Sequence, residues 1–261
     1  MVLRAFTDQV ALGLEARHLR RDAQTIESLS EANALRSSLL QAVSHDLRTP
    51  LASIKASVTG LLGAEVGFTD EQRVGLLANI DAATDRLDRV IGNLLDMSRL
   101  QAGAARPTLG PAALEEIIAA SLSALSAPAD RVQIDVDPDL PLVFTDPALL
   151  ERAVANLVSN ALSWGGSEHP VRIEAVQLAD RVALRIIDRG PGIPVADRER
   201  LLEPFQRRGN RSSDAGAGLG LAIAKGFIEV TGGSMEIDDT PGGGATITVA
   251  IPISPETDTQ P

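Results

Sequence analysis

The sequence predicts an α+β chain in which a hairpin of two long helices precedes an α/β sandwich. Residues 3–98 carry apolar side chains at helical spacing without a strand pattern, whereas residues 132–251 alternate short strand patterns with helices. Residues 101–111 between them are rich in glycine and proline, as linkers often are. The 261 residues leave room for one or two domains with a sizeable core.

The composition argues against several classes of partner and site. With 44% apolar but only 2% aromatic residues, the core must consist mainly of Ala, Leu, Val and Ile. A net charge of -11 without a basic cluster argues against binding to nucleic acid or to an anionic membrane. The absence of cysteine excludes disulfides and thiolate metal sites, and it fits the reducing cytosol. Because the sequence has no apolar run of about 18 residues and no signal peptide, we expect this chain to be soluble and cytoplasmic.

The helical part begins with an entry helix over residues 3–43 and continues as a hairpin. An apolar stripe steps by three, four and seven residues through Leu40, Val43, Leu47, Ile54, Val58 and Leu61. After a loop over residues 60–69, a second stripe runs through Leu77, Ile80, Thr84, Leu87, Ile91, Leu94 and Ser98. Two antiparallel helices cannot bury both apolar faces alone, so we expect a homodimer with a four-helix bundle. The alternative is a hairpin that docks on its own C-terminal domain.

The mixed part follows from periodicity and turn signals. Its helices are predicted over residues 114–126, 147–162, 197–203 and 219–231. Asp146 is a suitable N-cap for the second of them, and Pro147 is favoured in a first helical turn. Strands are predicted over residues 132–136, 142–145, 171–177, 182–188, 235–238 and 245–251. The tail, residues 253–261, is rich in Pro, Thr, Asp and Glu and is predicted to be disordered.

Residues 44–51, with the sequence Ser-His-Asp-Leu-Arg-Thr-Pro-Leu, place a histidine beside a carboxylate on the first hairpin helix. At about 3.6 residues per turn, His45 lies about 200° round the helix from Val43 but only about 40° from Thr49. We therefore expect His45 and Thr49 to share an exposed face, where a histidine is open to phosphorylation. Taken alone, a histidine here is an ordinary surface residue and Asp46 a surface charge.

Three motifs in the mixed part have the chemistry of a nucleotide site. Asn156 and Asn160 lie one turn apart on one helix face, and carboxamide oxygens beside a triphosphate suit Mg²⁺. Asp188 ends a strand, where its carboxylate can accept from the amino group of adenine, and the glycines after it allow close approach. A glycine cluster at residues 216–220 opens a helix whose free amides can hold phosphate. Each motif alone is also common in surface helices or plain turns.

Together with the octet, the order of these motifs resembles that of sensor histidine kinases. The octet resembles their H-box, and the N, G1, F and G2 boxes of a Bergerat-type (GHKL) ATP-binding domain are matched by residues 156–160, 188–192, 203–205 and 216–220. The resemblance covers residues 36–252. It implies ATP as substrate and Mg²⁺ as cofactor, with Asn156 and Asn160 as metal ligands, Asp188 reading adenine and a lid over residues 206–215. Gly190 and Gly192 are implied to make room for the base. The implied ATP-binding residues are Asn156, Asn160, Asp188, Gly190, Gly192, Phe205, Arg211, Gly216, Gly218 and Gly220.

The same resemblance implies a reaction and its partners. A neutral ring nitrogen of His45 attacks the γ-phosphate of ATP in line, while Asp46 takes or orients the proton on the other side of the ring. The phosphoryl group then passes to an aspartate of a receiver domain on a separate response regulator. Thr49 stands where relatives position the water that removes this phosphate again, so we expect a phosphatase activity as well.

Three positions depart from the family pattern. Ser163 stands where Lys or Arg is usual, and Trp164 where Tyr or Phe is usual. One cation beside the phosphates is therefore missing, so that either Arg211 replaces it or the affinity for nucleotide is lower. Arg189 stands where many kinases have Asn, and its side chain is expected to point to solvent.

Several segments are similar to one branch of the family, the potassium-responsive KdpD kinases. They are residues 94–103, 204–207, 218–226 and 239–244, and residues 3–15 resemble the closing helix of a GAF domain, which precedes the kinase core in that branch. The implied division is a signalling helix (1–34), a dimerisation and histidine phosphotransfer domain (35–104), a catalytic ATP-binding domain (112–252) and the tail. This chain would then be the output end of a longer membrane sensor, with a KdpE-like response regulator as partner.

Two functions of other classes stay open. The first is a degenerate kinase that only binds nucleotide or dimerises as a scaffold, and Ser163 is the residue that suggests it. The second is a GHKL ATPase or a protein-serine kinase of the anti-sigma type, which shares the nucleotide boxes but needs no H-box. ATP binding without label on His45 would favour the first, and the intact octet argues against the second.

Overall fold

The fold is taken from a computed structural model, which describes residues 43–44, 46–63, 68–125, 128–166, 168–206 and 218–254. The chain divides into two compact units, Met1–His45 and Asp46–Pro261, and each is considered by itself. Most of the predicted entry helix, tail and lid lies outside the described residues. None of the described helices is long and apolar enough to cross a membrane.

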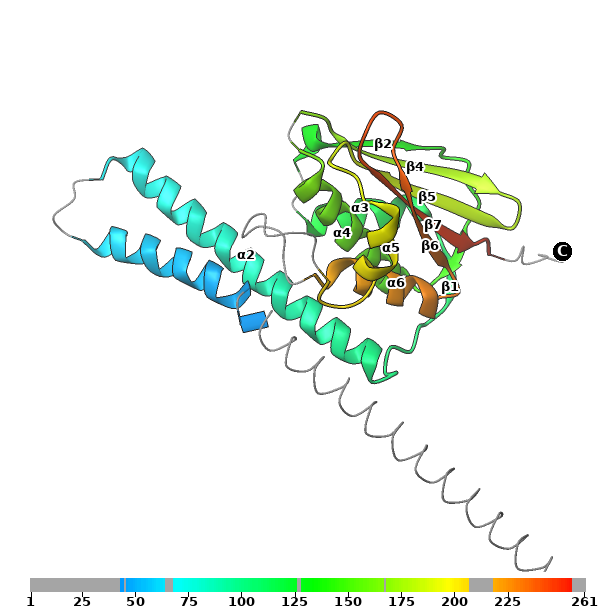
Figure 1. Cartoon of the computed structure of the whole chain (residues 1–261), viewed down its shortest axis with the longest axis horizontal. Coiled ribbons are helices and arrows are strands. Elements are labelled where there is room, and N and C mark those ends of the chain that lie inside the picture. The colour runs from blue at the N-terminus through cyan, green and yellow to red at the C-terminus, as the bar shows by residue number, and fades with distance from the viewer. Residues whose placement is uncertain are drawn as a thin grey trace, which may run out of the picture. The chain divides into compact units, whose positions relative to one another are not determined.

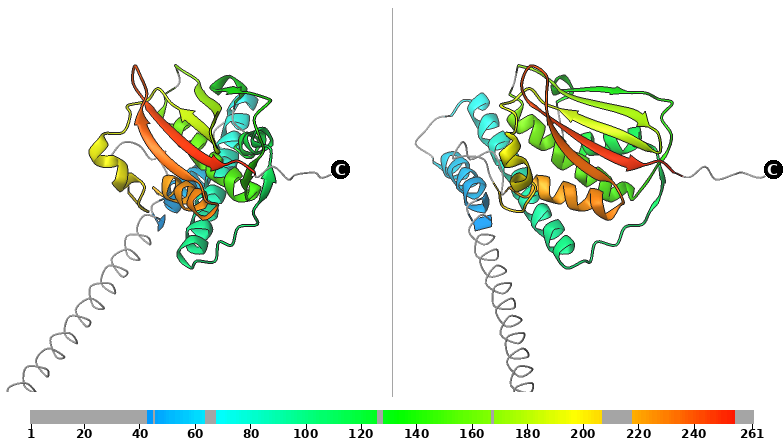
Figure 2. Two further views of the ribbon diagram at one scale, coloured as in Figure 1. Left: turned by 90° about the vertical axis from the view of Figure 1, so that its right-hand side faces the viewer. Right: turned by 45° about the vertical axis from the view of Figure 1, so that its right-hand side comes forward.

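The predicted helical hairpin is present in the second unit. Residues 46–62 form a helix, and α2 (Asp70–Gln101) runs beside it (Figures 1 and 2). Thr69 caps α2 in a capping box: its hydroxyl accepts from the backbone N–H of Gln72 at 3.3 Å, and the Gln72 side chain accepts from the backbone N–H of Thr69 at 3.0 Å. The connection is shorter than predicted because the first helix continues past Gly60 to residue 62.

The mixed part is an α/β sandwich, as predicted. Its sheet has the strand order β2 (Val132–Val136), β4 (Val171–Leu178), β5 (Arg181–Ile187), β7 (Ala245–Pro252), β6 (Ser234–Asp239). The pair β2 and β4 is parallel, and the other neighbours are antiparallel. The helices are α3 (Leu114–Ala124), α4 (Pro147–Trp164), α5 (Val195–Leu201) and α6 (Gly220–Val230), and a 3₁₀ turn, η1 (Ala129–Arg131), precedes β2. Figure 1 shows α3, α4 and α6 on one face of the sheet.

Alternating side chains of the strands build the core between the sheet and these helices. Ala175, Leu184 and Val249 are register partners across β4, β5 and β7, and all three are buried. From the other side, α4 contributes Leu157 and α6 contributes Phe227, both almost fully buried. Burying one large apolar side chain stabilises a fold by roughly 1.5–3 kcal/mol. The helices that carry the predicted site are therefore held firmly on the sheet.

The structure confirms the predicted start of α4. One carboxylate oxygen of Asp146 accepts from the backbone N–H groups of the two residues after Pro147, at 3.0 and 3.2 Å, and the other accepts from the backbone N–H of Thr108 at 2.7 Å. The segment predicted as a plain linker contains a strand, β1 (Gly110–Ala112), which pairs antiparallel with β3 (Val143–Thr145). The sequence does not predict this strand, because Gly and Pro give no strand pattern.

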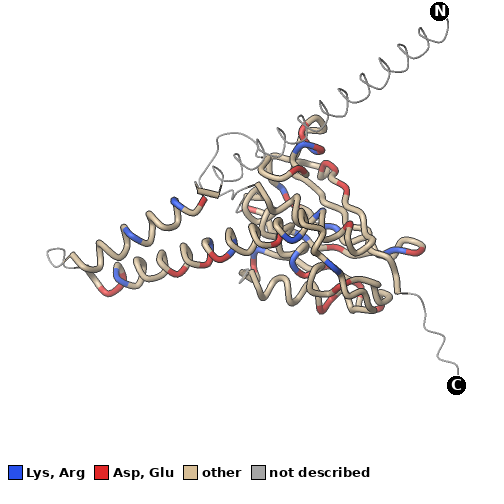
Figure 3. The backbone as a smooth tube through the Cα atoms, turned by 90° about the horizontal axis from the view of Figure 1, so that it is seen from below, with Lys and Arg blue, Asp and Glu red and all other residues tan. Residues whose placement is uncertain are grey.

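The predicted stripe on α2 divides into two groups. Ile80, Leu87 and Leu94 are half-buried, whereas Leu77 and Ile91 are 57% and 49% exposed in the single chain. The exposed group also includes Thr84 and Ser98, so its members lie seven residues apart and share one face of the helix. Acidic and basic residues are interspersed elsewhere along α2 (Figure 3). One apolar face of α2 thus remains open to a partner.

The C-terminal end of α2 docks on the sandwich. Met97 is buried in the core that the sheet and helices share, and Leu100 packs against it. A Cβ atom built on Gly226 of α6 would lie only 2.8 Å from a methyl group of Leu100, so the two helices are in close contact. The alternative expectation, a hairpin docked on its own C-terminal domain, therefore holds for this end of α2.

Candidate active site

A cavity of about 950 Å³ opens between α2, α4 and the start of α6. Six of the predicted site residues line it: Asn156, Asn160, Asp188, Gly192, Gly218 and Gly220. They come from α4, from the loop after β5 and from the segment that leads into α6. The fold therefore brings the three predicted nucleotide motifs together.

Asn156 is oriented by its own helix. Its Nδ2 donates to the backbone carbonyl of Arg152, 3.1 Å away, which leaves Oδ1 as an acceptor. This oxygen faces the start of α6, because a Cβ atom built on Gly220 would lie 3.6 Å from it. Asn160 lines the same cavity one turn further along α4. Carboxamide oxygens in this position are hard ligands of the kind that Mg²⁺ prefers.

Asp188 follows β5 and is buried, with a side chain held by backbone groups. Its Oδ1 accepts from the backbone N–H of Gly190 at 2.8 Å and from that of Ala245 at 3.1 Å. Its own backbone N–H donates to the carbonyl of Ala245 at 2.9 Å. No hydrogen bond from the described residues reaches Oδ2. The second carboxylate oxygen is thus the acceptor that remains for an amino group of a ligand.

The two glycines after Asp188 allow close backbone packing. A Cβ atom on Gly190 would lie 2.3 Å from the carbonyl oxygen of Trp164, at the end of α4. Gly192 has a φ of +65°, and its Cβ atom would lie 2.9 Å from the carbonyl oxygen of Gly244. Protein backbone therefore occupies the space that each missing side chain leaves. Room for the base, the role implied by the resemblance, stays a prediction.

Phe205 and the glycine segment meet at the entrance to α6. The backbone N–H of Phe205, whose φ is +66°, donates to the carbonyl of Gly218 at 3.0 Å. Leu219 is buried at the N-cap position, and among the described residues no side chain caps the helix that begins at Gly220. Its first N–H groups are therefore available to an anion. Two further predicted residues lie outside the described part of the chain, namely Arg211 and Gly216.

The histidine motif is described only in part. His45 lies outside the described residues. Asp46 is buried, with 3% of its surface exposed, so it is not the plain surface charge of the simplest interpretation. Thr49 is half-buried rather than fully exposed. The carboxylate that follows the histidine in the sequence is thus shielded from water.

The positions that depart from the family pattern have defined partners. The Ser163 hydroxyl, at the edge of the cavity, donates to the backbone carbonyl of Ser159 at 2.8 Å. Trp164 also lines the cavity. Arg189 is exposed, as the sequence suggested, but its guanidinium also donates to the carbonyl of Pro241 in the turn between β6 and β7. Sequence spacing gave no sign that this turn lies beside the loop after β5.

An ion pair joins α2 to the helix that carries the asparagines. Arg152 Nη1 and Asp96 Oδ1 lie 2.5 Å apart, and both residues line the cavity. Burial raises the pKa of the Asp96 carboxyl above its ordinary value, and the positive charges of Arg152 and Arg99 oppose this increase. Spacing along the sequence does not reveal this pair, because 56 residues separate its members and neither stands in a motif that predicts pairing.

Comparison with known proteins identifies two domain families. Residues 145–255 match the model "Histidine kinase-, DNA gyrase B-, and HSP90-like ATPase", and residues 35–103 match "His Kinase A (phospho-acceptor) domain". "Sensor protein KdpD" of Mycobacterium tuberculosis is 42% identical over 258 residues, which cover 96% of this chain and 30% of that protein. "Sensor protein KdpD" of Escherichia coli is 32% identical over 257 residues, covering 96% and 28%. This chain thus spans less than a third of the length of these relatives.

Solved structures share the architecture. The histidine kinase AdeS of Acinetobacter baumannii has the same fold, with a TM-score of 0.58, 20% identity, and coverage of 81% of this chain and 98% of that chain. A mycobacterial sensor histidine kinase, MprB, is 30% identical with a TM-score of 0.50, covering 57% of this chain and 99% of that chain. A phospho-acceptor domain followed by a kinase-type ATPase domain, together with this similarity, shows that the chain belongs to the sensor histidine kinases.

Proposed function

We propose that this chain is a kinase core that binds ATP with Mg²⁺, phosphorylates its own His45 and passes the phosphoryl group to a separate response regulator. The observation that carries the proposal is the convergence of Asn156, Asn160 and Asp188 on one cavity. The match of residues 35–103 to the phospho-acceptor domain supports His45 as the acceptor, since the octet lies inside that range.

The described residues fit a bound nucleotide. Asp188 Oδ2 accepts a hydrogen bond from the amino group of adenine, because backbone donors already occupy Oδ1. The N–H groups that begin α6 receive phosphate oxygens at the positive end of the helix dipole. Asn156 and Asn160 would hold Mg²⁺, which neutralises negative charge on the phosphates when it is bound.

His45, Asp46 and Thr49 carry the transfer steps. A neutral ring nitrogen of His45 forms a bond to the γ-phosphorus while the bond to the bridging oxygen of ADP breaks, and Asp46 accepts or orients the proton of the other ring nitrogen. The phosphoryl group then moves from the ring nitrogen to a carboxylate of the receiver domain. Thr49 positions the water that hydrolyses this acyl phosphate when the protein acts as a phosphatase.

The active form is proposed to be a homodimer. Leu77 and Ile91 leave an apolar face of α2 exposed in the single chain, and Leu51 on the first helix is 60% exposed. A second copy of the hairpin would cover both faces in a four-helix bundle. The docked end of α2 does not fill this role, because it involves the last turns of the helix, around Met97 and Leu100.

The parent protein is proposed to be a potassium-responsive membrane sensor of the KdpD type with a KdpE-like response regulator. The two relatives named KdpD support this, at 42% and 32% identity. In this proposal residues 1–34 carry the signal into a dimerisation and phosphotransfer domain at 35–104, and the catalytic domain at 112–252 responds. This chain is then the cytoplasmic output end of a longer protein.

Incubation of the purified chain with γ-labelled ATP and Mg²⁺ tests the kinase proposal. Label that is labile in acid and stable in base is expected on the wild type, because a phosphoramidate has this stability. It should be absent from His45→Gln and Asn160→Asp, although His45→Gln still binds ATP. Acid-stable label, or label that persists in His45→Gln, would contradict a histidine kinase.

A second candidate function is a nucleotide-binding dimeric scaffold. The observation that favours it is Ser163, which leaves an uncharged hydroxyl where relatives place a cation. In that case the wild-type chain would bind ATP and dimerise but carry no label on His45. An ATPase or serine kinase of another GHKL class is disfavoured, because neither needs a phospho-acceptor domain.

A further inference from the structure

The turn between β6 and β7, residues 240–244, packs directly on the backbone that carries Asp188. Gly244 has a φ of +108°, and a Cβ atom on it would lie 2.0 Å from the carbonyl oxygen of Asp188 and 2.8 Å from the Cα atom of Arg189. The contact is reciprocal, since a Cβ atom on Gly192 would lie 2.9 Å from the carbonyl oxygen of Gly244. Backbone meets backbone on both sides, so a side chain at position 244 must displace Asp188.

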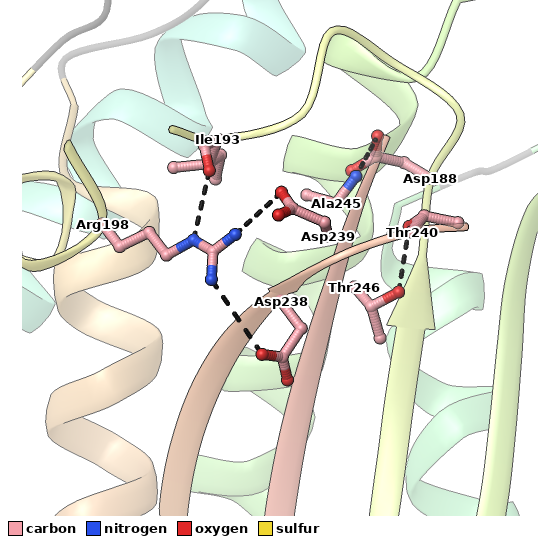
Figure 4. A network of polar contacts seen from close by, with 8 residues as sticks. All are labelled: Asp188, Ile193, Arg198, Asp238, Asp239, Thr240, Ala245 and Thr246. Atoms are coloured by element: carbon pink, nitrogen blue, oxygen red, sulfur yellow. Dashed lines mark hydrogen bonds and ion pairs between the residues drawn. The ribbon is translucent and has the colours of Figure 1, made fainter. Parts of the chain in front are cut away.

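The turn itself is fixed at its base and at its tip. The hydroxyl groups of Thr240 and Thr246 are hydrogen-bonded at 2.9 Å (Figure 4). The backbone N–H of Thr240 donates to the carbonyl of Gly244 at 3.1 Å. At the tip, the carbonyl of Pro241 accepts from the guanidinium of Arg189. The turn is therefore braced from its own strands and from the loop that it supports.

Arg198 on α5 ties the far end of the same loop to β6. Its Nε donates to the carbonyl of Ile193 at 3.1 Å, and its Nη2 lies 2.7 Å from Asp239 Oδ1 (Figure 4). Figure 4 also shows Ala245, the residue after the turn, directed at Asp188. The loop that begins at Asp188 is thus held at its start by the turn and at its end by Arg198.

We propose that the turn is a positioning element for Asp188, with Gly244 as the decisive residue, and that it sets the preference of the site for a purine with an amino group at C6. The inference rests on the proposed ATP binding. Ala245 follows Gly244 and donates to Asp188 Oδ1, so displacing Gly244 moves a donor that fixes the carboxylate. The direction of Oδ2, and with it the acceptor for the amino group, is then lost.

A comparison of ATP with inosine triphosphate, whose base is hypoxanthine, separates a positioning role of the turn from general support of the fold. Inosine triphosphate presents a carbonyl oxygen at C6 where ATP presents an amino group, so a correctly directed Oδ2 accepts from ATP but repels the inosine base. A merely structural defect lowers the affinity for both nucleotides alike. A misdirected carboxylate lowers the affinity for ATP but not that for inosine triphosphate, because the repulsion of the inosine base is relieved.

The experiment measures dissociation constants of both nucleotides with Mg²⁺ for the full chain, by calorimetric titration. Wild type should prefer ATP by about tenfold or more, as expected for one hydrogen bond to a charged group. Gly244→Ala should lose most of this preference. Gly243→Ala is the matched control and should keep the preference. Gly243 has the same φ of +108°, but no atom of the described residues lies within 4 Å of its Cβ position.

Arg189→Ala is a second test that introduces no backbone strain. If Gly244→Ala does not fold, Arg189→Ala tests whether the turn positions Asp188. It removes the bond to Pro241 and should reduce the preference for ATP in the same direction. An ATP preference that survives in Gly244→Ala, or in Arg189→Ala when the first variant does not fold, overturns this inference and leaves the proposed function standing. A wild-type chain that binds neither nucleotide overturns both.

Discussion

The ion pair between Asp96 and Arg152 makes a sharp prediction about stability. The Asp96 side chain is 3% exposed and that of Arg152 is 44% exposed. Removing one member of a fully buried pair costs about 3–5 kcal/mol, whereas exposed pairs contribute roughly 1 kcal/mol or less. Because solvent screens the half-exposed Arg152, we expect Arg152→Met to cost about 2 kcal/mol, between these limits. For a domain of this size that corresponds to a decrease of about 4–8 °C in melting temperature.

The cost of Arg152→Met should depend on pH in a defined direction. Burial raises the pKa of Asp96, so between the ordinary value of 3.8 and the raised value the folded chain binds a proton that the unfolded chain has released. The contribution of Asp96 to stability therefore falls as pH rises through this interval. Loss of Arg152 raises this pKa further and widens the interval. The penalty of Arg152→Met should thus be largest near neutral pH and shrink on acidification.

A double-mutant cycle tests both statements. Melting is measured for wild type, Asp96→Asn, Arg152→Met and the double variant, in a series of buffers from neutral pH down to the onset of acid unfolding. The double variant should be hardly less stable than Asp96→Asn alone, with a coupling of about 1–2 kcal/mol near neutral pH. Costs that simply add, or a penalty that grows on acidification, would refute the pairing of these two side chains.

Three further outcomes follow from the site and the hairpin. Ser163→Lys should lower the dissociation constant for ATP about threefold to tenfold by restoring a cation beside the phosphates; Ser163→Met should not, and an equal effect of both would refute the electrostatic reason. Ile91→Asp should convert the dimer to monomers in light scattering, because a charge buried in the interface costs several kcal/mol. Asn79→Asp, at an exposed position outside the stripe, should leave the dimer intact. A dimer that persists in Ile91→Asp would contradict the proposed interface. Chelation of Mg²⁺ should weaken ATP binding by wild type but hardly that by Asn156→Ala; equal weakening would exclude Asn156 as a ligand.

Local signals in the sequence predicted most of the elements that build the site. Asp146 and Pro147 marked the start of α4 because capping chemistry is local, and alternation located β4, β5 and β7 within one or two residues. The strand β1 was missed, since its Gly and Pro mimic a linker and its pairing with β3 depends on a distant partner.

Contacts between distant segments were beyond the reach of sequence reasoning. Asp188 was predicted as the group that reads adenine, yet nothing in its surroundings in sequence indicates that Ala245 donates to it. Gly244 was noted only within residues 239–244, a segment similar to KdpD kinases, and its tight contact with Asp188 appears only in three dimensions. Arg152 could not be paired from the sequence, because its partner, Asp96, lies on another helix. Side-chain partners across a fold depend on register and packing, which spacing along the chain does not encode.

The most direct test of the central claim is to locate the phosphoryl group after incubation with ATP and Mg²⁺, by mass spectrometry of peptides kept at neutral to basic pH. In this account, ATP bound in the cavity that Asp188 lines transfers its γ-phosphoryl group to His45. Wild type should carry the modification on His45, and Asp188→Asn, folded but impaired in binding the base, should carry little or none. Modification of a serine or threonine instead, or undiminished modification of His45 in Asp188→Asn, would contradict the account.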